Sequence, residues 1–479
     1  MTELQHAAKA TRPRIQPAEE GDRRPLSVSA RLGRLQFHQS GKFRVLQFAD
    51  IQDGPRVSKD TISLIEASLD ATRPDLVIFN GNQIAGYDSA YALTSRKRRW
   101  DARPASASSE ASGERYAAAL EHTRELVRAT IEQLVHPLAD RGVPWAVTFG
   151  NHDFQCGLDN DEIESICREF PGCINPERAA DGTTGIAVKH GVKHDVGDME
   201  QDFGLPEQPV IACAPGTFAL SVTDVDRTYD VLGLVLLDSG DYARSGGYGS
   251  LADAPGLMAA QSQQLQQDRQ DEQDSPREPR KTPSTLPCMV FQHFPIEQYY
   301  RLLKPVAATA ARAIEGYRNF AGRHFVLNED KTQPGSYLGE GVSCPDADSG
   351  EFAILDKAGY FAISAGHDHR NAFVGSVPVG TDGDRQMMMV ASPTSGFGSY
   401  GPVPAKRAAR LFEFDIRHPY EPRTQLLEYD ELVGKPSAGK AYAYGMTSES
   451  KPDSEGMDLL HRPTWWSKTW NKLVSLFRR

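Results

Sequence analysis

The tetrapeptide Gly150-Asn151-His152-Asp153 directly follows a short apolar run at 145–149. Apolar runs of this length are typical of strands that are buried on both faces. Four other such runs also end at Asp, Asn or His side chains, and the residues that follow them are Asp50, Asn80-Gly81-Asn82, His293 and Gly366-His367-Asp368-His369. Ligands of α/β sheets bind outside the carboxyl ends of the strands. We therefore predict one functional site that five remote segments build together.

Helical patterns separate the first of these strands. Ser58 is suited to begin a helix that carries Ile62, Ile65 and Leu69 on one face, and Pro74 stops it. After a loop or insertion at 92–114, a second helix is predicted from 114 to 140. Further strands are predicted at 218–222, 231–237, 386–390 and 409–414. This alternation predicts β-α-β units and an α/β fold.

The overall composition is that of a globular protein, and it excludes some classes of function. The formal net charge of −11 argues against non-specific binding of nucleic acid. The first 36 residues contain no apolar core of a signal peptide, and no apolar run is long enough to span a bilayer. We therefore expect a cytoplasmic protein.

The six cysteines include no CxxC pair, which argues against a zinc ribbon. In a cytoplasmic chain of this length they are expected to be buried thiols. Cys156, Cys167 and Cys173 are close enough in sequence to form a redox or metal cluster, which is the alternative.

The two ends of the chain differ in composition from its middle. Residues 1–36 are polar and Arg-rich and are predicted to form a flexible tail, while 433–462 have the Gly, Ser, Lys and Pro content of a linker. Residues 463–479 show the pattern of an amphipathic helix, with Trp466, Trp470 and Phe477 on one face. Such a helix suits peripheral contact with an anionic membrane. Docking on the protein's own domain explains the pattern equally well.

The five strand-end motifs resemble those of the calcineurin-like metallophosphoesterases, and most closely their purple-acid-phosphatase-like branch. The family pattern is Asp-x-His, Gly-Asp, Gly-Asn-His-Asp/Glu, a lone His and Gly-His-x-His. This chain has, in the same order, Asp50-Ile51-Gln52, Gly81-Asn82, Gly150-Asn151-His152-Asp153, His293 and Gly366-His367-Asp368-His369. The run from Thr394 to Gly401 also resembles that branch. The resemblance spans about residues 40–430 and implies a two-sheet α-β-β-α sandwich, which we place at 37–432.

The resemblance also implies metal ligands. It assigns Asn151, His293 and His367 to one divalent ion. It assigns Asp50 and His369 to a second ion, with Asn82 at the place of the family's bridging Asp. Side chains of these types suit Mn, Fe or Zn, and we expect one or two ions per chain.

Two catalytic side chains follow from the same resemblance. His152 would protonate the leaving group or hold a phosphate oxygen, and Asp153 would orient His152. Asp238, which follows another predicted strand, has no assigned role and is expected to be a turn residue.

Two positions depart from the family pattern. Gln52 replaces a His and Asn82 replaces the bridging Asp, and both changes keep the shape of the side chain while weakening its affinity for metal. The site at Asp50 is therefore expected to bind its ion weakly, unless Asp53 or Gln83 compensates. On the residues alone, Asp50 could instead cap a turn.

The leading hypothesis is a metal-dependent phosphoric-ester hydrolase, either a phosphatase or a phosphodiesterase. It would use a metal-activated water on a phosphorylated small molecule or protein. The alternative is a catalytically degenerate relative that binds a phosphorylated ligand or a protein partner without turnover. Gln52 and Asn82 favour the alternative, and the intact motifs at 150–153 and 366–369 favour the hydrolase.

Overall fold

The computed structural model describes residues 24–101, 110–177, 185–188, 204–242, 286–380, 383 and 385–437. The chain divides into two compact units, 1–443 and 444–479, and all the described residues belong to the first. The amphipathic helix predicted at 463–479 and most of the linker predicted at 433–462 lie outside the described residues. Both therefore stay predictions. No helix of the described ranges is both long and apolar enough to cross a bilayer.

The first sheet has five strands in the order β16-β15-β1-β2-β3. Its strands are β1 Lys42–Phe48, β2 Leu76–Asn80, β3 Trp145–Thr148, β15 Ala408–Asp415 and β16 His418–Glu428. The first three are parallel, and β15 pairs antiparallel with β1. Helices α2 (Lys59–Thr72) and α3 (Glu110–Ala139) connect β1 to β2 and β2 to β3. These connections confirm the two predicted β-α-β units.

The second sheet has eight strands in the order β13-β14-β12-β8-β7-β6-β5-β4. Its strands are β4 Gly185–Val188, β5 Pro209–Ala214, β6 Thr217–Thr223, β7 Asp230–Leu237, β8 Cys288–Gln292, β12 Tyr360–Ala365, β13 Phe373–Val379 and β14 Arg385–Ala391. Strands β7, β8, β12 and β14 are parallel. Their carboxyl ends therefore lie at one edge of the sheet.

A small third sheet and several short helices complete the described fold. The sheet consists of β9 Leu303–Val306, β10 Ile314–Glu315 and β11 His324–Leu327. The remaining helices are α1 Val28–Leu32, α4 Asn160–Arg168, α6 Glu351–Lys357 and α7 Tyr429–Val433. The 3-10 helices are η1 Ser89–Tyr91, η2 Asp153–Cys156, η3 Glu297–Leu302, η4 Arg318–Phe320 and η5 Pro404–Lys406.

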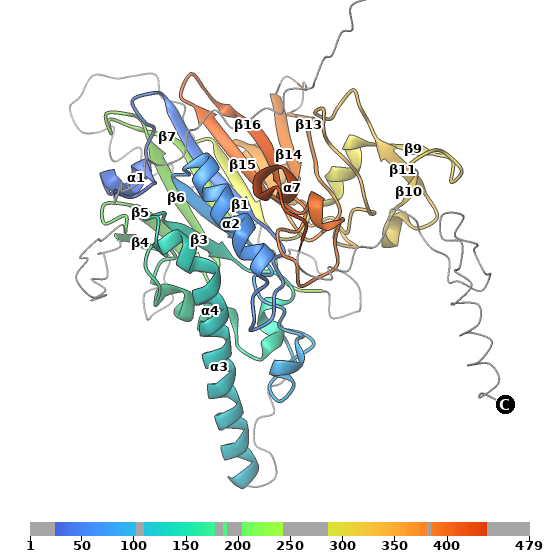
Figure 1. Cartoon of the computed structure of the whole chain (residues 1–479). Coiled ribbons are helices and arrows are strands. Elements are labelled where there is room, and N and C mark those ends of the chain that lie inside the picture. Colours follow the sequence, from blue (N-terminus) through green and yellow to red (C-terminus); the bar gives the residue numbers. More distant parts are fainter. Residues whose placement is uncertain are drawn as a thin grey trace, which may run out of the picture. The chain divides into compact units, whose positions relative to one another are not determined.

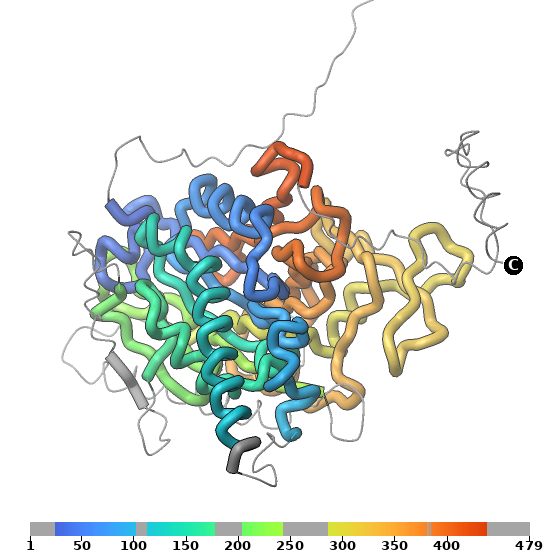
Figure 2. The backbone as a smooth tube through the Cα atoms, turned by 60° about the horizontal axis from the view of Figure 1, so that its bottom comes forward, coloured from blue at the N-terminus to red at the C-terminus, as the bar shows by residue number. Residues whose placement is uncertain are grey.

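The two large sheets pack face to face, as alternation along β2 illustrates. Leu76 and Ile78 point into the layer between the sheets, whereas Val77 and Phe79 point outward to α2 and α3. Figures 1 and 2 show these two helices on the outer side of the five-stranded sheet. The predicted two-sheet sandwich is confirmed. The outer layer on the second sheet is less helical than expected, since α6, η3 and the small sheet cover it together.

The N-terminal boundary of the domain was placed too late. Residues 24–36, predicted to be part of a flexible tail, pack on the domain through α1. Asp75 accepts hydrogen bonds from the backbone N–H and the hydroxyl of Ser29, at 3.1 and 3.0 Å, and Leu26 and Leu35 are buried. The C-terminal boundary at 432 falls inside α7, where Tyr429 is buried against Phe397.

The described structure agrees with the prediction that the cysteines are buried thiols. Five are buried, and Cys213 is half-buried. Burial raises the pKa of Cys156 to about 12 and that of Cys167 well above its usual value. Thiols with such pKa values stay protonated and are poor nucleophiles and metal ligands.

Glu351, at the start of α6, gives a pH-dependent stability prediction. It is 1% exposed, and burial raises the pKa of its carboxyl group from 4.5 to about 8. The unfolded chain loses this proton near pH 4.5 and the folded chain only near pH 8, so the free energy of unfolding falls as the pH rises through this window. We expect Glu351→Gln to stabilise the protein by about 2–4 kcal/mol at pH 8 and to have little effect at pH 4.5.

Urea denaturation at both pH values measures the effect, with the exposed Glu297→Gln as the control. An equal effect of Glu351→Gln at both pH values would contradict the role of ionisation.

Candidate metal centre

The structure brings all five strand-end motifs to one place. Asp50 follows β1, Asn82 follows β2, Asn151 follows β3, His293 follows β8, and His367 and His369 follow β12. All six side chains are buried. They come from both large sheets, so the site lies where the carboxyl ends of their parallel strands meet.

Backbone strain is concentrated at this site. Of the described residues, eight other than glycine have positive φ angles, and four of these are Asp50, Gln52, Asn82 and His367, at 50°, 44°, 55° and 68°. Such conformations are costly for residues with a Cβ and persist only where the surrounding structure enforces them. Gly81, at φ 87°, allows the close approach of His293, because a Cβ there would lie 2.5 Å from its Nδ1.

Three donor atoms from remote segments form one compact set. His293 Nε2 lies 2.9 Å from Asn151 Oδ1 and 3.3 Å from His367 Nδ1. Atoms that ligate the same divalent ion at about 2.0–2.2 Å lie roughly 3 Å apart. We call Asn151, His293 and His367 the amide–histidine set, and its geometry fits one cation. The described residues contain no group of three His, Cys, Asp or Glu side chains placed to hold a metal ion.

Hydrogen bonds and burial prepare these side chains to bind a cation. His293 Nδ1 donates to the backbone carbonyl of Asn80 at 3.3 Å, so its Nε2 keeps a lone pair. Asn151 Nδ2 donates to the hydroxyl of Tyr242 at 3.0 Å, which turns Oδ1 toward His293. Burial lowers the pKa of His293 and, more strongly, that of His367, and so favours the neutral form of both rings. Neutral imidazole is the form that binds metal.

Asn82 is oriented the opposite way. Its Oδ1 accepts a hydrogen bond from the backbone N–H of His152 at 2.9 Å. Its Nδ2 therefore faces the three acceptors of the site, at 3.1 Å from Asp50 Oδ1, 3.3 Å from Asn151 Oδ1 and 2.9 Å from His293 Nε2. An amide NH2 group has no lone pair to offer a cation. At the position where the family bridges two ions, this chain supplies a hydrogen-bond donor.

Gln52 also directs its NH2 group into the site, toward His369. Its Nε2 lies 3.1 Å from Nε2 of His369, while its Oε1 accepts hydrogen bonds from Tyr87 and Ser399, at 3.1 and 2.8 Å. In the neutral His369 ring, where Nδ1 donates to the backbone carbonyl of Tyr400 at 2.7 Å, Nε2 accepts from the Gln52 amide. This second position therefore does not fit a cation.

The charge on Asp50 is compensated within the protein. Its Oδ2 accepts a hydrogen bond from the backbone N–H of His367 at 2.6 Å, and its Oδ1 lies 3.3 Å from His369 Nε2. Burial alone would raise the pKa of Asp50, but His293 and His369 outweigh it and hold the pKa well below its usual range. Asp50 in turn raises the pKa of His369 against the effect of burial. Asp50 thus serves the site rather than capping its own turn.

Asp153 has a different role from the predicted one. Its carboxylate accepts four backbone N–H groups, from Gly150, Asn82, Gln83 and Ile84, at 2.7, 2.8, 2.8 and 3.2 Å. The partner of His152 is Gln155, whose Oε1 lies 2.7 Å from His152 Nδ1. The prediction that Asp153 orients His152 was wrong, because the lone pairs of Asp153 are used to join the loops after β2 and β3. The i, i+3 spacing of His152 and Gln155 was the available signal.

Neither residue proposed to compensate for Gln52 and Asn82 does so. Asp53 accepts hydrogen bonds from the Ser58 backbone at 3.0 Å and the Thr61 hydroxyl at 2.7 Å, at the start of α2. Gln83 donates to the carbonyl of Thr148 at 2.9 Å. Both side chains are thus committed to holding backbone segments together.

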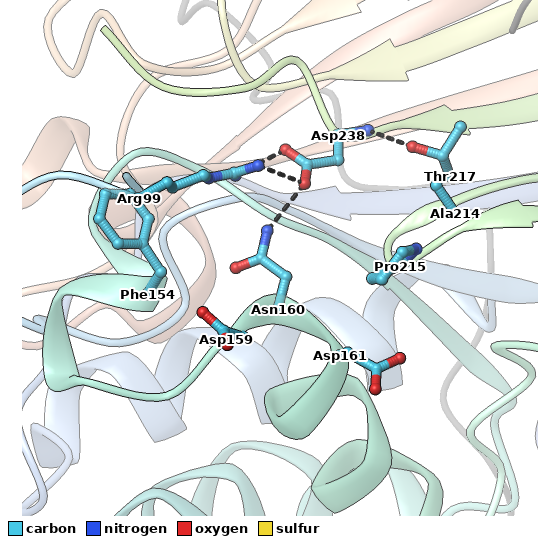
Figure 3. Close-up of a pocket in the computed structure, with 9 residues that line it drawn as sticks. All are labelled: Arg99, Phe154, Asp159, Asn160, Asp161, Ala214, Pro215, Thr217 and Asp238. Atoms are coloured by element: carbon cyan, nitrogen blue, oxygen red, sulfur yellow. Dashed lines mark hydrogen bonds and ion pairs between the residues drawn. The ribbon is translucent and has the colours of Figure 1, made fainter. Parts of the chain in front are cut away.

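Asp238 is more than a turn residue. Its carboxylate pairs with both terminal nitrogens of Arg99, at 2.7 and 2.8 Å, and accepts a hydrogen bond from Asn160 at 2.7 Å. Figure 3 shows these contacts at one side of a pocket of about 350 Å³, which Phe154 and Pro215 also line. None of the residues that line this pocket belongs to the metal centre.

Three tyrosines that the sequence analysis did not single out touch the site. Tyr87 stands edge-on to the His152 ring, at 4.9 Å between centroids, and Tyr400 stacks on the His369 ring at 4.1 Å and 6°. Tyr242 accepts the hydrogen bond from Asn151 described above. We call Tyr87, Tyr242 and Tyr400 the tyrosine rim. Only Tyr400 lay in a quoted motif, the run from Thr394 to Gly401.

A sandwich of two sheets with an amide–histidine set at its strand ends defines a protein of the metallophosphoesterase class. The chain belongs to the calcineurin-like phosphoesterase family, whose model matches residues 43–305. His367 and His369 lie beyond the matched residues. The fold brings them to the site.

Three relatives are similar at low identity. "Probable inactive purple acid phosphatase 29" of Arabidopsis thaliana is 20% identical over 474 residues, which cover 94% of this chain and 92% of that protein. "Probable inactive purple acid phosphatase 14" of the same plant is 20% identical, covering 80% and 77%. "Phosphatase DCR2" of Saccharomyces cerevisiae is 22% identical, covering 73% of this chain and 47% of that protein.

Proposed function

We propose that the protein hydrolyses a phosphoric ester, on a small molecule or a protein, with one divalent cation held by the amide–histidine set. The observation that carries this proposal is the separation of 2.9 and 3.3 Å between donor atoms from three remote segments. When bound, such a cation supplies charge neutralisation at phosphorus and a more acidic water. The two-ion arrangement is not proposed, because Asn82 and Gln52 direct NH2 groups at the second position.

His152 would act on the leaving group. The hydrogen bond to Gln155 leaves Nε2 of His152 as the reactive nitrogen. Burial lowers the pKa of His152 to about 4, so the ring is neutral at pH 7 before an ester binds. A bound phosphate dianion raises this pKa, because a nearby negative charge favours the imidazolium form. Nε2 can then give its proton to the departing alkoxide.

The second candidate is a protein that binds a phosphorylated ligand or partner without hydrolysing it. The orientation of Asn82 favours this candidate, since its NH2 group lies within hydrogen-bond distance of three acceptors, at the place that a cation would otherwise take. The names of the two plant relatives, which call those proteins probably inactive, are consistent with it.

Metal content and turnover together separate the two candidates. For the hydrolase we expect about one Mn, Fe or Zn ion per chain by elemental analysis, and hydrolysis of an aryl phosphate that Mn²⁺ stimulates. His293→Ala should lower both, by at least tenfold in rate, because His293 is the central donor of the set. Protein without metal that binds phosphate esters but does not turn them over would favour the second candidate.

A further inference from the structure

The tyrosine rim places an aromatic ring, that of Tyr87, beside His152, the residue that we propose acts on the leaving group. Tyr87 is 51% exposed and Tyr400 is 37% exposed, although both contact buried or half-buried rings of the site. Each comes from a loop at a different strand end, after β2 and after β14. Two partly exposed tyrosines in contact with a polar site are unlike the six buried side chains at its centre.

The anchoring of Tyr87 limits how it can move. Its hydroxyl donates to Oε1 of Gln52 at 3.1 Å, and its ring packs against the His152 ring at an angle of 75°. The ring is therefore held by its hydroxyl and by its contact with His152, while about half of the side chain stays in solvent. A rigid, half-exposed aromatic ring loses little conformational entropy when a ligand packs against it.

We propose that the alcohol part of the ester carries a planar aromatic group, as in an aryl ester or a nucleoside phosphate, and that this group packs against Tyr87. The inference rests on the proposed function, because there His152 gives its proton to the departing alcohol. The departing group then lies beside Tyr87. Stacking of a planar ring on an aromatic side chain contributes more than contact with a saturated ring of equal size.

Binding of non-hydrolysable phosphonates tests the inference without turnover. Benzylphosphonate and cyclohexylmethylphosphonate have the same phosphonate group and rings of similar size, but only the first ring is planar. With Mn²⁺ present, calorimetry on the full chain should give a dissociation constant about 5–10 times lower for benzylphosphonate. A nucleoside 5′-phosphonate compared with the corresponding ribose phosphonate shows whether the aromatic group is a base.

Two variants at position 87 and one control separate stacking from other effects. Tyr87→Phe keeps the aromatic ring and should keep the preference for benzylphosphonate. Tyr87→Leu should bind the two phosphonates with about equal affinity. Tyr420→Leu replaces another exposed tyrosine, 37% exposed against 51% for Tyr87, which lies on β16 and contacts Phe361, and it should leave the preference unchanged.

The outcomes distinguish this inference from the proposed function. Equal binding of the two phosphonates in the unchanged protein, or a preference that survives in Tyr87→Leu, overturns the inference and leaves the proposed function intact. Failure of every phosphonate to bind overturns both.

Discussion

Replacing Asn82 with Asp should make the thermal stability of the protein depend much more strongly on divalent metal. In the unchanged chain the Asn82 amide donates to Asp50 Oδ1 at 3.1 Å. A carboxylate there would face Asp50 at the same distance, a repulsion of about 5 kcal/mol at an effective dielectric constant of 20. We therefore expect a lower melting temperature for Asn82→Asp in chelator, and recovery by Mn²⁺ or Zn²⁺ equivalent to about 3–4 kcal/mol at a large excess of metal over its dissociation constant.

The unchanged protein and Asn80→Asp are the controls. The ion that we propose for the unchanged protein should raise its melting temperature, but by less than the rise in Asn82→Asp, where metal also removes the repulsion between two carboxylates. Asn80 ends the same strand, but its Nδ2 donates to the backbone carbonyl of Gln292 at 2.8 Å. Asn80→Asp should therefore lose stability and gain no more from metal than the unchanged protein does. An equal rise with metal in Asn82→Asp and Asn80→Asp would contradict the role assigned to Asn82.

Adding Gln52→His to Asn82→Asp should restore a second ion. The double variant then has four side chains that can bind a cation at the second position: Asp50, His369 and the two new residues at 52 and 82. We expect two ions per chain and an increase of about 10²-fold in aryl phosphate hydrolysis, which corresponds to about 3 kcal/mol of additional transition-state stabilisation. A second ion without any gain in rate would mean that the site serves binding and not hydrolysis.

Asp153→Asn should destabilise the protein by about 1–3 kcal/mol at pH 8, because it breaks part of the link between two loops. Asp153 accepts four backbone N–H groups. An amide in its place turns an NH2 group toward two of these donors and leaves them without an acceptor. Burial raises the pKa of Asp153 to about 7, against the effect of the four N–H groups, so at pH 8 the amide also removes the cost of a buried charge, and the net loss is smaller than that of the two hydrogen bonds. Urea denaturation at pH 8 measures this difference.

Gln155→Leu is the matched control for Asp153→Asn. It removes the hydrogen-bond partner of His152 and leaves the four backbone donors satisfied. We expect it to lower activity while changing stability by about 1 kcal/mol or less. If Asp153→Asn instead kept full stability and lost only activity, Asp153 would act through His152 after all.

Much of the fold could be predicted from the sequence, because the strands are short apolar runs that are buried on both faces. The runs before Asp50, Gly150 and His293 lie on β1, β3 and β8 as predicted. The small sheet β9–β11 was missed, because its strands are two to four residues long and partly exposed, and such segments carry no alternating pattern. Residues 24–36 were misjudged because their partner, Asp75, lies far away in sequence.

The sequence by itself determined which side chains reach the site, since each motif sits at the end of a strand and parallel strands end at a common edge. Only the tertiary structure decided what these side chains present to one another. Asn82 and Asn151 are chemically identical, yet one turns its NH2 group and the other its oxygen into the site. The physical reason is non-local: the backbone N–H of His152 donates to the oxygen of Asn82, and the Tyr242 hydroxyl accepts a hydrogen bond from the NH2 group of Asn151.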